Sequence, residues 1–490
     1  MRVALGLFAT SCWFFFAVAY LFGATVADHA EASVAALSLI WHNGQPLYDS
    51  AQPLRTPLYG PVLFAANRIH LLFSSDILST GKLLGIVASS FALIGILVVS
   101  RRRVGLADSI LVTGFAAAAL MAFGSYPISV RGDGLLFLFV SLSIVLMDSN
   151  RTDSRAMGLR WFLLGVIAGL AMGVKVTAPI YFLPAAAAAI GTEFRIRYLI
   201  YAGSGALLFL AAPFVVFDGL NPEAYLSALG QAADHPRLIS NALGILVCGV
   251  ILVLPLMATL LIQADREEWW ARFKWPGLAL GISLMLLCVF GSKIGAGEHH
   301  AIPLIPVTSW LWAGALGVFR PDVDSARPRI LLSVISLMFL AFLGFSIPKV
   351  HGETQTLDAE TIREARQELR TILAEEYPHS ISLGYGGDYK LSYLRSLVIA
   401  EGHDHTLDSS VLMDADLQGL AVGSDVLDSF RSCEVDRWII PRDAVPFERT
   451  SFYGEYGSPN IFGPDLGRVF LESYEPISRH SIFSVWGCQP

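Results

Sequence analysis

Charged side chains are scarce in this sequence: they make up 15% of its 490 residues, while hydrophobic side chains make up 54%. Soluble domains carry charge on roughly a quarter of their residues, so the composition excludes an ordinary soluble enzyme. The mean hydropathy of +0.57 agrees with this conclusion. A lipid bilayer is therefore the solvent in which the chain has to be considered.

An excess of basic residues is also missing, because the net charge is −7. Residues 1–348 carry 22 Lys and Arg against 18 Asp and Glu, whereas residues 349–490 carry 12 against 23. Binding of nucleic acid requires a basic surface. The acidic C-terminal segment therefore argues against nucleic acid as a partner.

Cysteine is rare as well, with five in the chain. Cys12, Cys248 and Cys288 lie within apolar runs, where a cysteine acts as a small hydrophobic residue. Cys433 and Cys488 lie in the polar C-terminal segment and are candidates for a disulfide if that segment is extracytoplasmic. Because the sequence does not show whether their Cβ atoms meet, the pairing stays open.

Long apolar runs, in contrast, are abundant. The first, at residues 3–22, has the length of a membrane helix, which favours an uncleaved span over a signal peptide. Ten more follow, several of them shorter than the roughly 20 residues that cross a bilayer core. They lie at residues 83–99, 110–123, 134–147, 161–174, 176–190, 198–217, 243–261, 275–291, 302–319 and 330–347.

Lys and Arg are distributed unequally between alternate loops. One set of loops holds fourteen of them, at residues 101–103, 151–160, 195–197, 266–274 and 320–329, and the opposite set holds seven. Basic residues gather in cytoplasmic loops. The N-terminus is therefore predicted to be cytoplasmic, and eleven crossings place the C-terminal segment outside.

The C-terminal segment has the patterns of a small α/β domain. Residues 357–377 form an amphipathic pattern that ends before Pro378, which predicts a helix. Apolar, β-rich runs follow at residues 380–386, 436–441 and 481–487, with helical stretches between them. The clustered glycines of GYGGD lack the spacing of a nucleotide fingerprint and indicate a turn.

We therefore predict an α-helical polytopic membrane protein of about eleven spans, at residues 1–348, followed by a C-terminal extracytoplasmic α/β domain at residues 349–490. The predicted location is the cell (inner) membrane.

The first outer loop, at residues 23–82, carries two carboxylates. Asp28 and Glu31 lie three residues apart, which places them on one face of a helix just above the membrane. Further on, the prolines and glycine of RTPLYGP break the helix and turn the chain back. The alternative is that Asp28 only caps a surface-lying amphipathic helix.

The other outer loops are short but rich in ionisable residues. These are Arg131 and Asp133 in SVRGDG, Lys175 in GVKVTAP, and Lys293, Glu298, His299 and His300 in SKIGAGEHHAIP. Charges at membrane depth are costly and usually face a cavity or pathway inside the protein. The alternative is a local Arg131–Asp133 pair, lysines that extend to the membrane interface, and solvated histidines.

Several of these outer motifs occur in one order along about the first 310 residues. They are the acidic residue in VADHAEA, the G-x-P-L-Y stretch at 44–48, TPLYGP at 56–61, R-x-D at 131–133, K-x-T-A at 175–178, and KIGAGEHH before IPLIP. In this order they resemble the GT-C class of integral-membrane glycosyltransferases. The bacterial branch related to protein mannosyltransferases and to aminoarabinose, galacturonosyl and arabinofuranosyl transferases is the most similar.

The resemblance implies transfer of a sugar from a polyprenyl-phosphate donor to a lipid, glycan or protein acceptor on the outer face of the membrane. A carboxylate would take the proton of the acceptor hydroxyl, and this implies a catalytic role for Asp28 or Glu31. Many relatives carry adjacent acidic residues here, whereas Asp28 is followed by His29, so the division of roles between the two carboxylates stays open.

The same chemistry requires cations that neutralise the departing lipid phosphate. The resemblance assigns this role to Arg131, Lys175 and Lys293, with His299 or His300. Asp133 and Glu298 complete the expected substrate-binding set. No metal or other cofactor is required, although Asp28, Glu31 and the two histidines leave a divalent metal open.

A transporter or flippase of a lipid-linked sugar or small polar solute is the competing hypothesis. Such a protein is expected to have internal repeats and charges near the membrane midplane in broken helices. The sequence shows neither clearly, and only the apolar pair split by Lys175 points in that direction. Transferase is therefore the favoured function.

Overall fold

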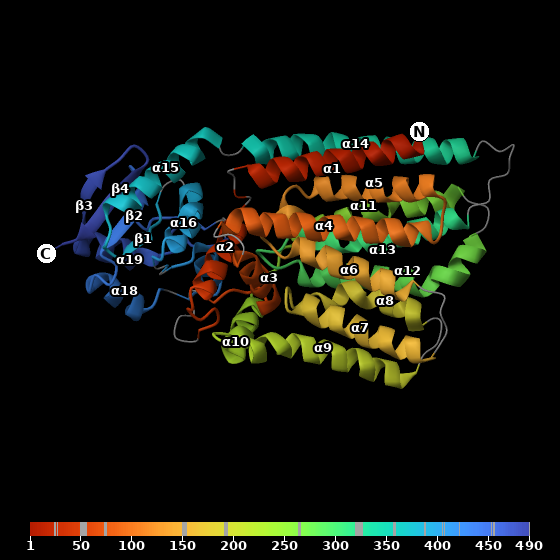
Figure 1. Cartoon of the computed structure of the whole chain (residues 1–490), viewed down its shortest axis with the longest axis horizontal. Coiled ribbons are helices and arrows are strands. Elements are labelled where there is room, and N and C mark those ends of the chain that lie inside the picture. The colour runs from red at the N-terminus through yellow and green to blue at the C-terminus, as the bar shows by residue number, and fades with distance from the viewer. Residues whose placement is uncertain are drawn as a thin grey trace. The chain divides into compact units, whose positions relative to one another are not determined.

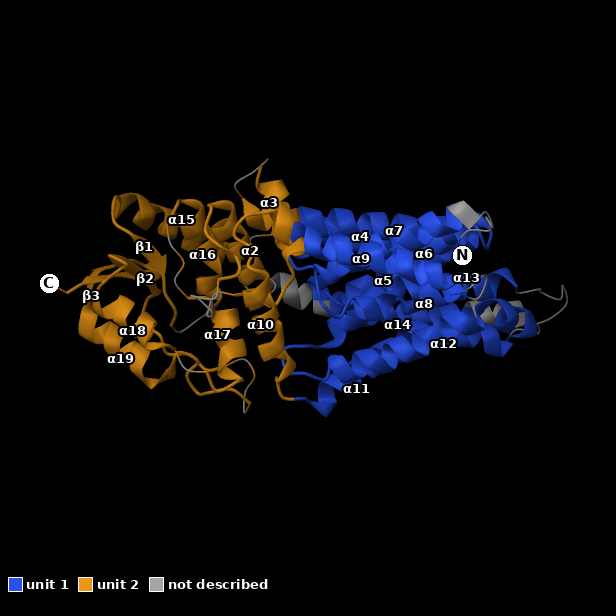
Figure 2. Cartoon of the chain, turned by 90° about the horizontal axis from the view of Figure 1, so that it is seen from below, with its two compact units in different colours: residues 1–22, 82–213, 237–354 blue, residues 23–81, 214–236, 355–490 orange. Residues whose placement is uncertain are grey.

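The computed structural model describes residues 1–23, 26, 28–49, 56–72, 76–148, 154–190, 195–262, 266–318, 327–355, 359–386, 389–403, 405, 407–420, 422–451, 453 and 456–489. The chain forms two compact units, which Figure 2 shows in different colours. Unit 1 consists of Met1–Phe22, Lys82–Pro213 and Arg237–Thr354, and unit 2 consists of Gly23–Gly81, Phe214–Pro236 and Gln355–Pro490. Unit 2 thus combines the C-terminal segment with two earlier parts of the chain. Whether residues 349–490 are a domain by themselves stays a prediction.

Unit 1 is built from helices that lie side by side with roughly parallel axes (Figure 1). Each of the eleven predicted apolar runs overlaps a helix. The elements are α1 (Arg2–Phe22), α4 (Ile77–Arg101), α5 (Leu106–Ala122), η2 (Tyr126–Ile128), α6 (Asp133–Met147), α7 (Ser154–Met172), α8 (Pro179–Ile190), α9 (Ile196–Val216), α11 (Ile239–Ile262), α12 (Arg266–Phe290), η3 (Glu298–Leu304), α13 (Ile305–Gly317) and α14 (Arg327–Gln355).

Five of the described helices, α1, α4, α9, α11 and α12, are long and apolar enough to cross a bilayer. Shorter apolar helices are α5, α6, α8 and the segments Ala156–Met172 and Ser333–Pro348. The prediction of an apolar, helical N-terminal part is confirmed. The number of about eleven spans stays a prediction.

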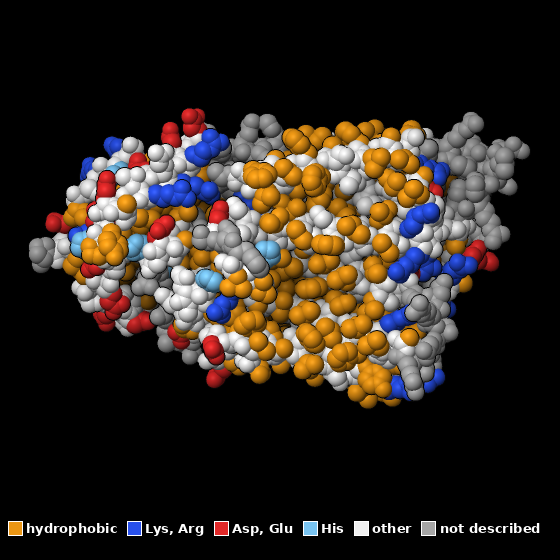
Figure 3. All heavy atoms as spheres, in the orientation of Figure 1, with side chains coloured by type: hydrophobic (Ala, Val, Ile, Leu, Met, Phe, Trp, Pro, Cys, Tyr) orange, Lys and Arg blue, Asp and Glu red, His pale blue; other side chains and the backbone are white. Residues whose placement is uncertain are grey.

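Basic side chains gather at one end of the unit 1 helices, and hydrophobic side chains cover the middle (Figure 3). Ion pairs join different parts of the chain: Arg2 of α1 lies 2.6 Å from Asp108 of α5, and Arg103 pairs with Asp148. Arg103 also lies over the ring of Phe273, 5.3 Å from its centroid. This distribution is the one expected of a membrane protein whose basic loops share one side. Which side is cytoplasmic stays a prediction.

Unit 2 combines helices with a small sheet. Its elements are α2 (His29–His42), α3 (Pro61–Leu71), α10 (Pro222–Ala233), α15 (Ala359–Glu375), β1 (Ile381–Leu383), η4 (Tyr389–Leu394), α16 (Arg395–Ala400), α17 (Ser409–Asp416), α18 (Ser424–Arg431), β2 (Arg437–Pro441), α19 (Gly463–Ser473), β3 (Tyr474–Arg479) and β4 (Phe483–Cys488).

The sheet has the strand order β1-β2-β4-β3, with β1 parallel to β2 and the other pairs antiparallel. Side chains alternate between its two faces. Trp438 and Ile440 join a hydrophobic core with α18 and α19, whereas Ile439 and Val485 join a second core with α15 and α16. The predicted helix and three predicted strands are confirmed as α15, β1, β2 and β4, and β3 was not predicted.

Helix α2 is buried rather than exposed at a surface. Every residue from Ala30 to Trp41 is buried, and α3, α16 and α17 pack against the helix. The Ser33 hydroxyl donates to the carboxylate of Asp408. Asp408 also accepts from Arg395 at 3.0 Å. The alternative of a surface-lying amphipathic helix is therefore wrong, because residues of the C-terminal segment, about 375 positions further along the chain, cover α2.

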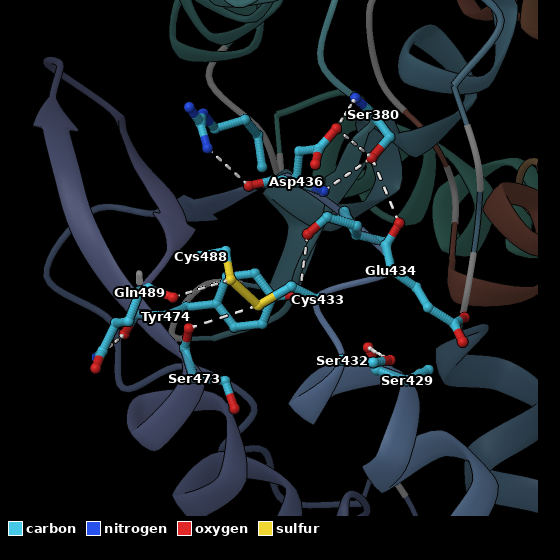
Figure 4. The surroundings of a disulfide bond; sticks show 12 residues. Ser380, Ser429, Ser432, Cys433, Glu434, Asp436, Ser473, Tyr474, Cys488 and Gln489 are labelled. Carbon is cyan, nitrogen blue, oxygen red and sulfur yellow. Dashed lines mark hydrogen bonds between the residues drawn. A yellow bond between two sulfur atoms is a disulfide. The ribbon is translucent and has the colours of Figure 1, made fainter.

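Cys433 and Cys488, whose pairing the sequence left open, form a disulfide with a Cα–Cα distance of 5.9 Å (Figure 4). Cys433 follows α18, and Cys488 ends β4. Beside the bond, the Tyr474 hydroxyl donates to the Val435 carbonyl at 2.9 Å. The bond therefore joins the end of α18 to the end of β4, an inner strand of the sheet.

Candidate functional site

In unit 1, Arg131 lies in the turn between η2 and α6, and Asp133 is the first residue of α6. Ser89 of α4 donates to the Pro127 carbonyl at 2.7 Å. Gly134 packs so closely on this turn that a Cβ atom would lie 2.4 Å from the same carbonyl. Only glycine fits there. The contact fixes Asp133 in the first turn of α6, where the helix dipole favours a negative charge.

Asp133 binds two cations that come from different loops. Its Oδ1 accepts from Lys175 Nζ at 2.6 Å, and its Oδ2 lies 3.3 Å from Arg131 Nε. The side chains of Asp133 and Arg131 are 2% and 6% exposed, and that of Lys175 is 11% exposed. Buried charges persist only when they are paired in this way. Lys175 is therefore directed into the protein instead of along its surface, and Arg131 and Asp133 belong to a group of three charges.

Arg131 also connects the turn before α6 to η3. Its Nη2 lies 3.2 Å from Nε2 of His299. Because a guanidinium only donates, Nε2 accepts and the imidazole is neutral. The guanidinium lies over the Tyr126 ring, 4.6 Å from its centroid, and the rings of Tyr126 and His299 are 5.0 Å apart. His299 is buried, so it is not a solvated loop residue.

His300 lies next to the same group. Its ring centroid is 4.7 Å from that of His299, and its carbonyl accepts from the Tyr181 hydroxyl at 2.9 Å. Burial lowers the pKa of His300 to about 3, and the positive charges of Lys175 and Arg131 act in the same direction. The negative charge of Asp133 opposes this shift. The ring is therefore neutral at physiological pH.

The five side chains Arg131, Asp133, Lys175, His299 and His300 form what we call the outer cationic cluster, after the predicted position of their loops. Two cations and one carboxylate give it a net charge of +1, because both imidazoles are neutral. A partly buried positive group attracts an anion more strongly than the same group in water. The cluster is therefore suited to bind a phosphate and to stabilise negative charge that develops on it.

Of two further predicted residues, Lys293 lies in the loop between α12 and η3, and Glu298 is the first residue of η3. The Lys293 carbonyl accepts from Asn241 Nδ2 at 3.0 Å, and residue 293 pairs with Arg237 in an antiparallel bridge. Glu298 is exposed, and its side chain lies against Gly244 of α11, where an added Cβ would be 3.2 Å away. These contacts place both residues against the start of α11, and their share in substrate binding stays a prediction.

The two predicted catalytic carboxylates belong to unit 2. Asp28 is the N-cap of α2, and its Oδ1 accepts from the Glu31 backbone N–H at 2.8 Å. Asp28 is partly exposed, whereas Glu31 is buried. The capping role considered from the sequence is therefore real. A carboxylate that caps a helix still has an oxygen with spare acceptor capacity, so capping does not exclude a role as a base.

Tyr453 of the C-terminal segment lies close enough to Asp28 to interact with its charge. Burial raises the pKa of Tyr453 well above its usual value. The charge of Asp414 and its hydrogen bond raise this pKa further, as do nearby Tyr59 and Asp28. The Tyr453 hydroxyl donates to Asp414 at 3.2 Å. The C-terminal segment thus contributes polar groups to the surroundings of Asp28 within unit 2.

Sequence reasoning missed Tyr126 and Tyr181, which contact Arg131 and His300. Tyr126 stands five residues before Arg131 in the same loop, so an aromatic residue near a buried cation was the available signal. Tyr181 stands in an apolar run and gives no signal. Among the residues that the structure describes, no three His, Cys, Asp or Glu side chains are grouped to hold a metal ion.

No protein-family model matches the sequence, and no curated protein matches it. The structure is similar to that of ArnT from Cupriavidus metallidurans bound to undecaprenyl phosphate, with a TM-score of 0.61 and 15% identity over 99% of this chain and 97% of that one. The apo state of ArnT gives the same TM-score with 14% identity, over 99% and 96%. The oligosaccharyltransferase of Archaeoglobus fulgidus, tethered to an acceptor peptide, gives a TM-score of 0.52 with 10% identity, over 97% and 72%. The chain has the fold of these GT-C glycosyltransferases, so the resemblance inferred from the sequence is confirmed at the level of the fold.

Proposed function

We propose that the protein is a membrane glycosyltransferase that takes a sugar from a polyprenyl-phosphate donor and delivers it to a lipid, glycan or protein acceptor. The observation that carries the proposal is the outer cationic cluster, in which Arg131 and Lys175 share Asp133. The fold supports the same function, since the similar ArnT structure holds undecaprenyl phosphate.

The proposed reaction divides the work between two kinds of group. Arg131 and Lys175 bind the lipid phosphate and stabilise the charge that it gains as the bond to the anomeric carbon breaks. Asp28 accepts the proton of the acceptor hydroxyl as its oxygen attacks that carbon. Asp133 positions the two cations, and His299 holds the Arg131 guanidinium in place.

Binding of undecaprenyl phosphate by the purified protein tests the phosphate site. We expect Lys175→Met and Arg131→Gln each to weaken binding roughly 10- to 100-fold, because a hydrogen bond to a charged group contributes about 1.5–3 kcal/mol. Undecaprenol, which lacks the phosphate, is the ligand control, and Arg195→Gln, at an exposed basic residue, is the protein control. Equal binding of the alcohol and the phosphate would contradict the proposed site.

A further inference from the structure

A second feature of unit 1 lies outside the outer cationic cluster. It is a groove of about 860 Å³ between α11 and α12, closed at its base by Leu311 of α13. Pockets that hold small organic ligands have volumes of about 300–1,000 Å³. The groove is therefore large enough for a hydrocarbon chain.

The lining of the groove is apolar along most of its length. Leu254 and Met257 of α11 face Trp270, Leu278 and Gly281 of α12 across it. Leu254, Met257, Trp270 and Leu278 are each more than 40% exposed, so the groove opens at the outside of the helix pair. In a membrane, this outside is the acyl-chain region.

The charged lining residues Arg266, Glu267 and Lys274 all lie in the first third of α12. Arg266 donates to the Leu260 and Leu261 carbonyls, which holds its guanidinium at the end of α11. The Lys274 ammonium lies 5.4 Å from the centroid of the Trp275 ring. The groove thus has an apolar body and a basic end.

This basic end is the one opposite to the outer cationic cluster. Helix α11 begins where Leu238 donates to the Ser292 carbonyl at 2.6 Å, next to the loop that leads into η3. The groove uses the second half of α11, from Val250 to Leu260, over about 15 Å. This length is about half of a 30 Å hydrocarbon core, and it belongs to the leaflet predicted to face the cytoplasm.

We propose that the groove binds one anionic phospholipid of that leaflet, with an acyl chain along the apolar body and the phosphate beside Arg266 and Lys274. Complementary charge supports this occupant, because the cytoplasmic leaflet carries anionic headgroups that attract basic side chains. Glu267 leaves the basic end with a net charge of +1. A polyprenyl-phosphate donor is a poor fit, since its phosphate is assigned to the opposite end of the helices.

Native mass spectrometry of the detergent-solubilised protein, titrated with phosphatidylglycerol or with phosphatidylcholine of the same acyl chains, tests the proposal. We expect one phosphatidylglycerol to be retained in preference to phosphatidylcholine. Arg266→Gln with Lys274→Gln should lower this preference by about 25-fold, since each basic side chain near an anionic headgroup contributes roughly fivefold. Arg272→Gln is the matched control, because Arg272 lies on the same helix outside the groove and pairs with Glu268.

A second pair of variants tests the apolar body. A Cβ atom on Gly281 meets open space in the groove, so Gly281→Leu should fill it and lower the retention of both lipids. Gly203→Leu, at an exposed and equally open position of α9, should change neither. Equal retention of both lipids by the wild-type protein would overturn the proposal. The proposal would also be overturned if the wild-type protein had the mass of a dimer instead of a lipid adduct and Gly281→Leu abolished this dimer.

Discussion

Asp28 has two roles that substitution can separate. As the N-cap of α2 it accepts the Glu31 backbone N–H at 2.8 Å, and in the proposed reaction it accepts a proton. Asn and Ser cap a helix about as well as Asp. Neither Asn nor Ser is a base, so both keep the first role and lose the second.

We expect Asp28→Asn and Asp28→Ser to lower sugar transfer by about 10² to 10⁴, the usual loss when a general base is removed. Both proteins should unfold near the wild-type temperature. Asp28→Ala should in addition lose about 1 kcal/mol of stability with the cap, and Glu31→Gln should affect transfer less. Transfer rates in isolated membranes and thermal unfolding in detergent measure the two effects. Near-normal transfer by Asp28→Asn would leave Asp28 as a helix cap alone.

Asp414 gives unit 2 a pH dependence. Burial raises the pKa of its carboxyl to about 7, although the Tyr453 hydrogen bond opposes this shift. Because the folded pKa exceeds the unfolded one, the protonated carboxyl stabilises the fold fully below about pH 4. This contribution is lost as the pH rises through about 7.

The wild-type protein should therefore unfold at a lower temperature at pH 8 than at pH 6. Asp414→Asn, which stays neutral, should remove the part of this stability loss that falls between pH 6 and pH 8, about 1 kcal/mol, and flatten the dependence of the unfolding temperature on pH. Asp428→Asn, at an exposed side chain, serves as the control in the same scanning fluorimetry series. An unchanged slope in Asp414→Asn would show that the carboxyl is already ionised at pH 6.

At the scale of elements, the packing of α6 on the preceding turn positions the outer cationic cluster. A Cβ on Gly134 would lie 2.4 Å from the Pro127 carbonyl and 2.9 Å from that of Gly85. These are backbone atoms, so they do not yield as a flexible side chain would. The first turn of α6, with Asp133, has to move away from Arg131 and Lys175 if this position gains a side chain.

Gly134→Ala is expected to lose about 1–3 kcal/mol of stability, the usual cost of overpacking, and to weaken binding of undecaprenyl phosphate as Asp133 moves. Gly203→Ala on α9, where a Cβ meets open space, should bind the lipid like the wild-type protein. Wild-type affinity in a folded Gly134→Ala protein would show that the cluster does not depend on this contact.

The elements differ in how far the sequence predicts them. Apolar runs of bilayer length are a strong signal, and each overlaps a helix. Strand β3 was missed because its segment, YEPISR, contains a proline and is mostly exposed at the sheet edge. The burial of α2 depends on Asp408, which is 375 residues away from its partner Ser33, and no local pattern reports such a contact. The ionisable residues of the predicted outer loops were identified from their density in the sequence. Their pairing through Asp133 could be identified only from the folded structure.

At the scale of the whole molecule, the disulfide reports the location of the C-terminal segment. Disulfides persist in oxidising compartments and are rare in the cytosol. If residues 349–490 are extracytoplasmic, Cys433 and Cys488 should resist alkylation in cells lysed under a thiol-blocking reagent, until a reductant is added. Cysteine labelling should place positions 102 and 155 on the opposite side. Free thiols at 433 and 488 in freshly blocked cells would overturn the orientation.

The fate of the lipid-linked sugar distinguishes a transferase from a transporter. The purified protein is reconstituted into vesicles with polyprenyl-phosphate sugars extracted from membranes of the source organism, an envelope extract is added as acceptor, and the lipids are analysed by mass spectrometry. We expect the wild-type protein to convert a polyprenyl-phosphate sugar into free polyprenyl phosphate, and Asp28→Asn and Lys175→Met to leave it intact. An unchanged donor pool with wild-type protein, together with movement of the intact sugar lipid between leaflets, would contradict the transferase and identify a transporter instead.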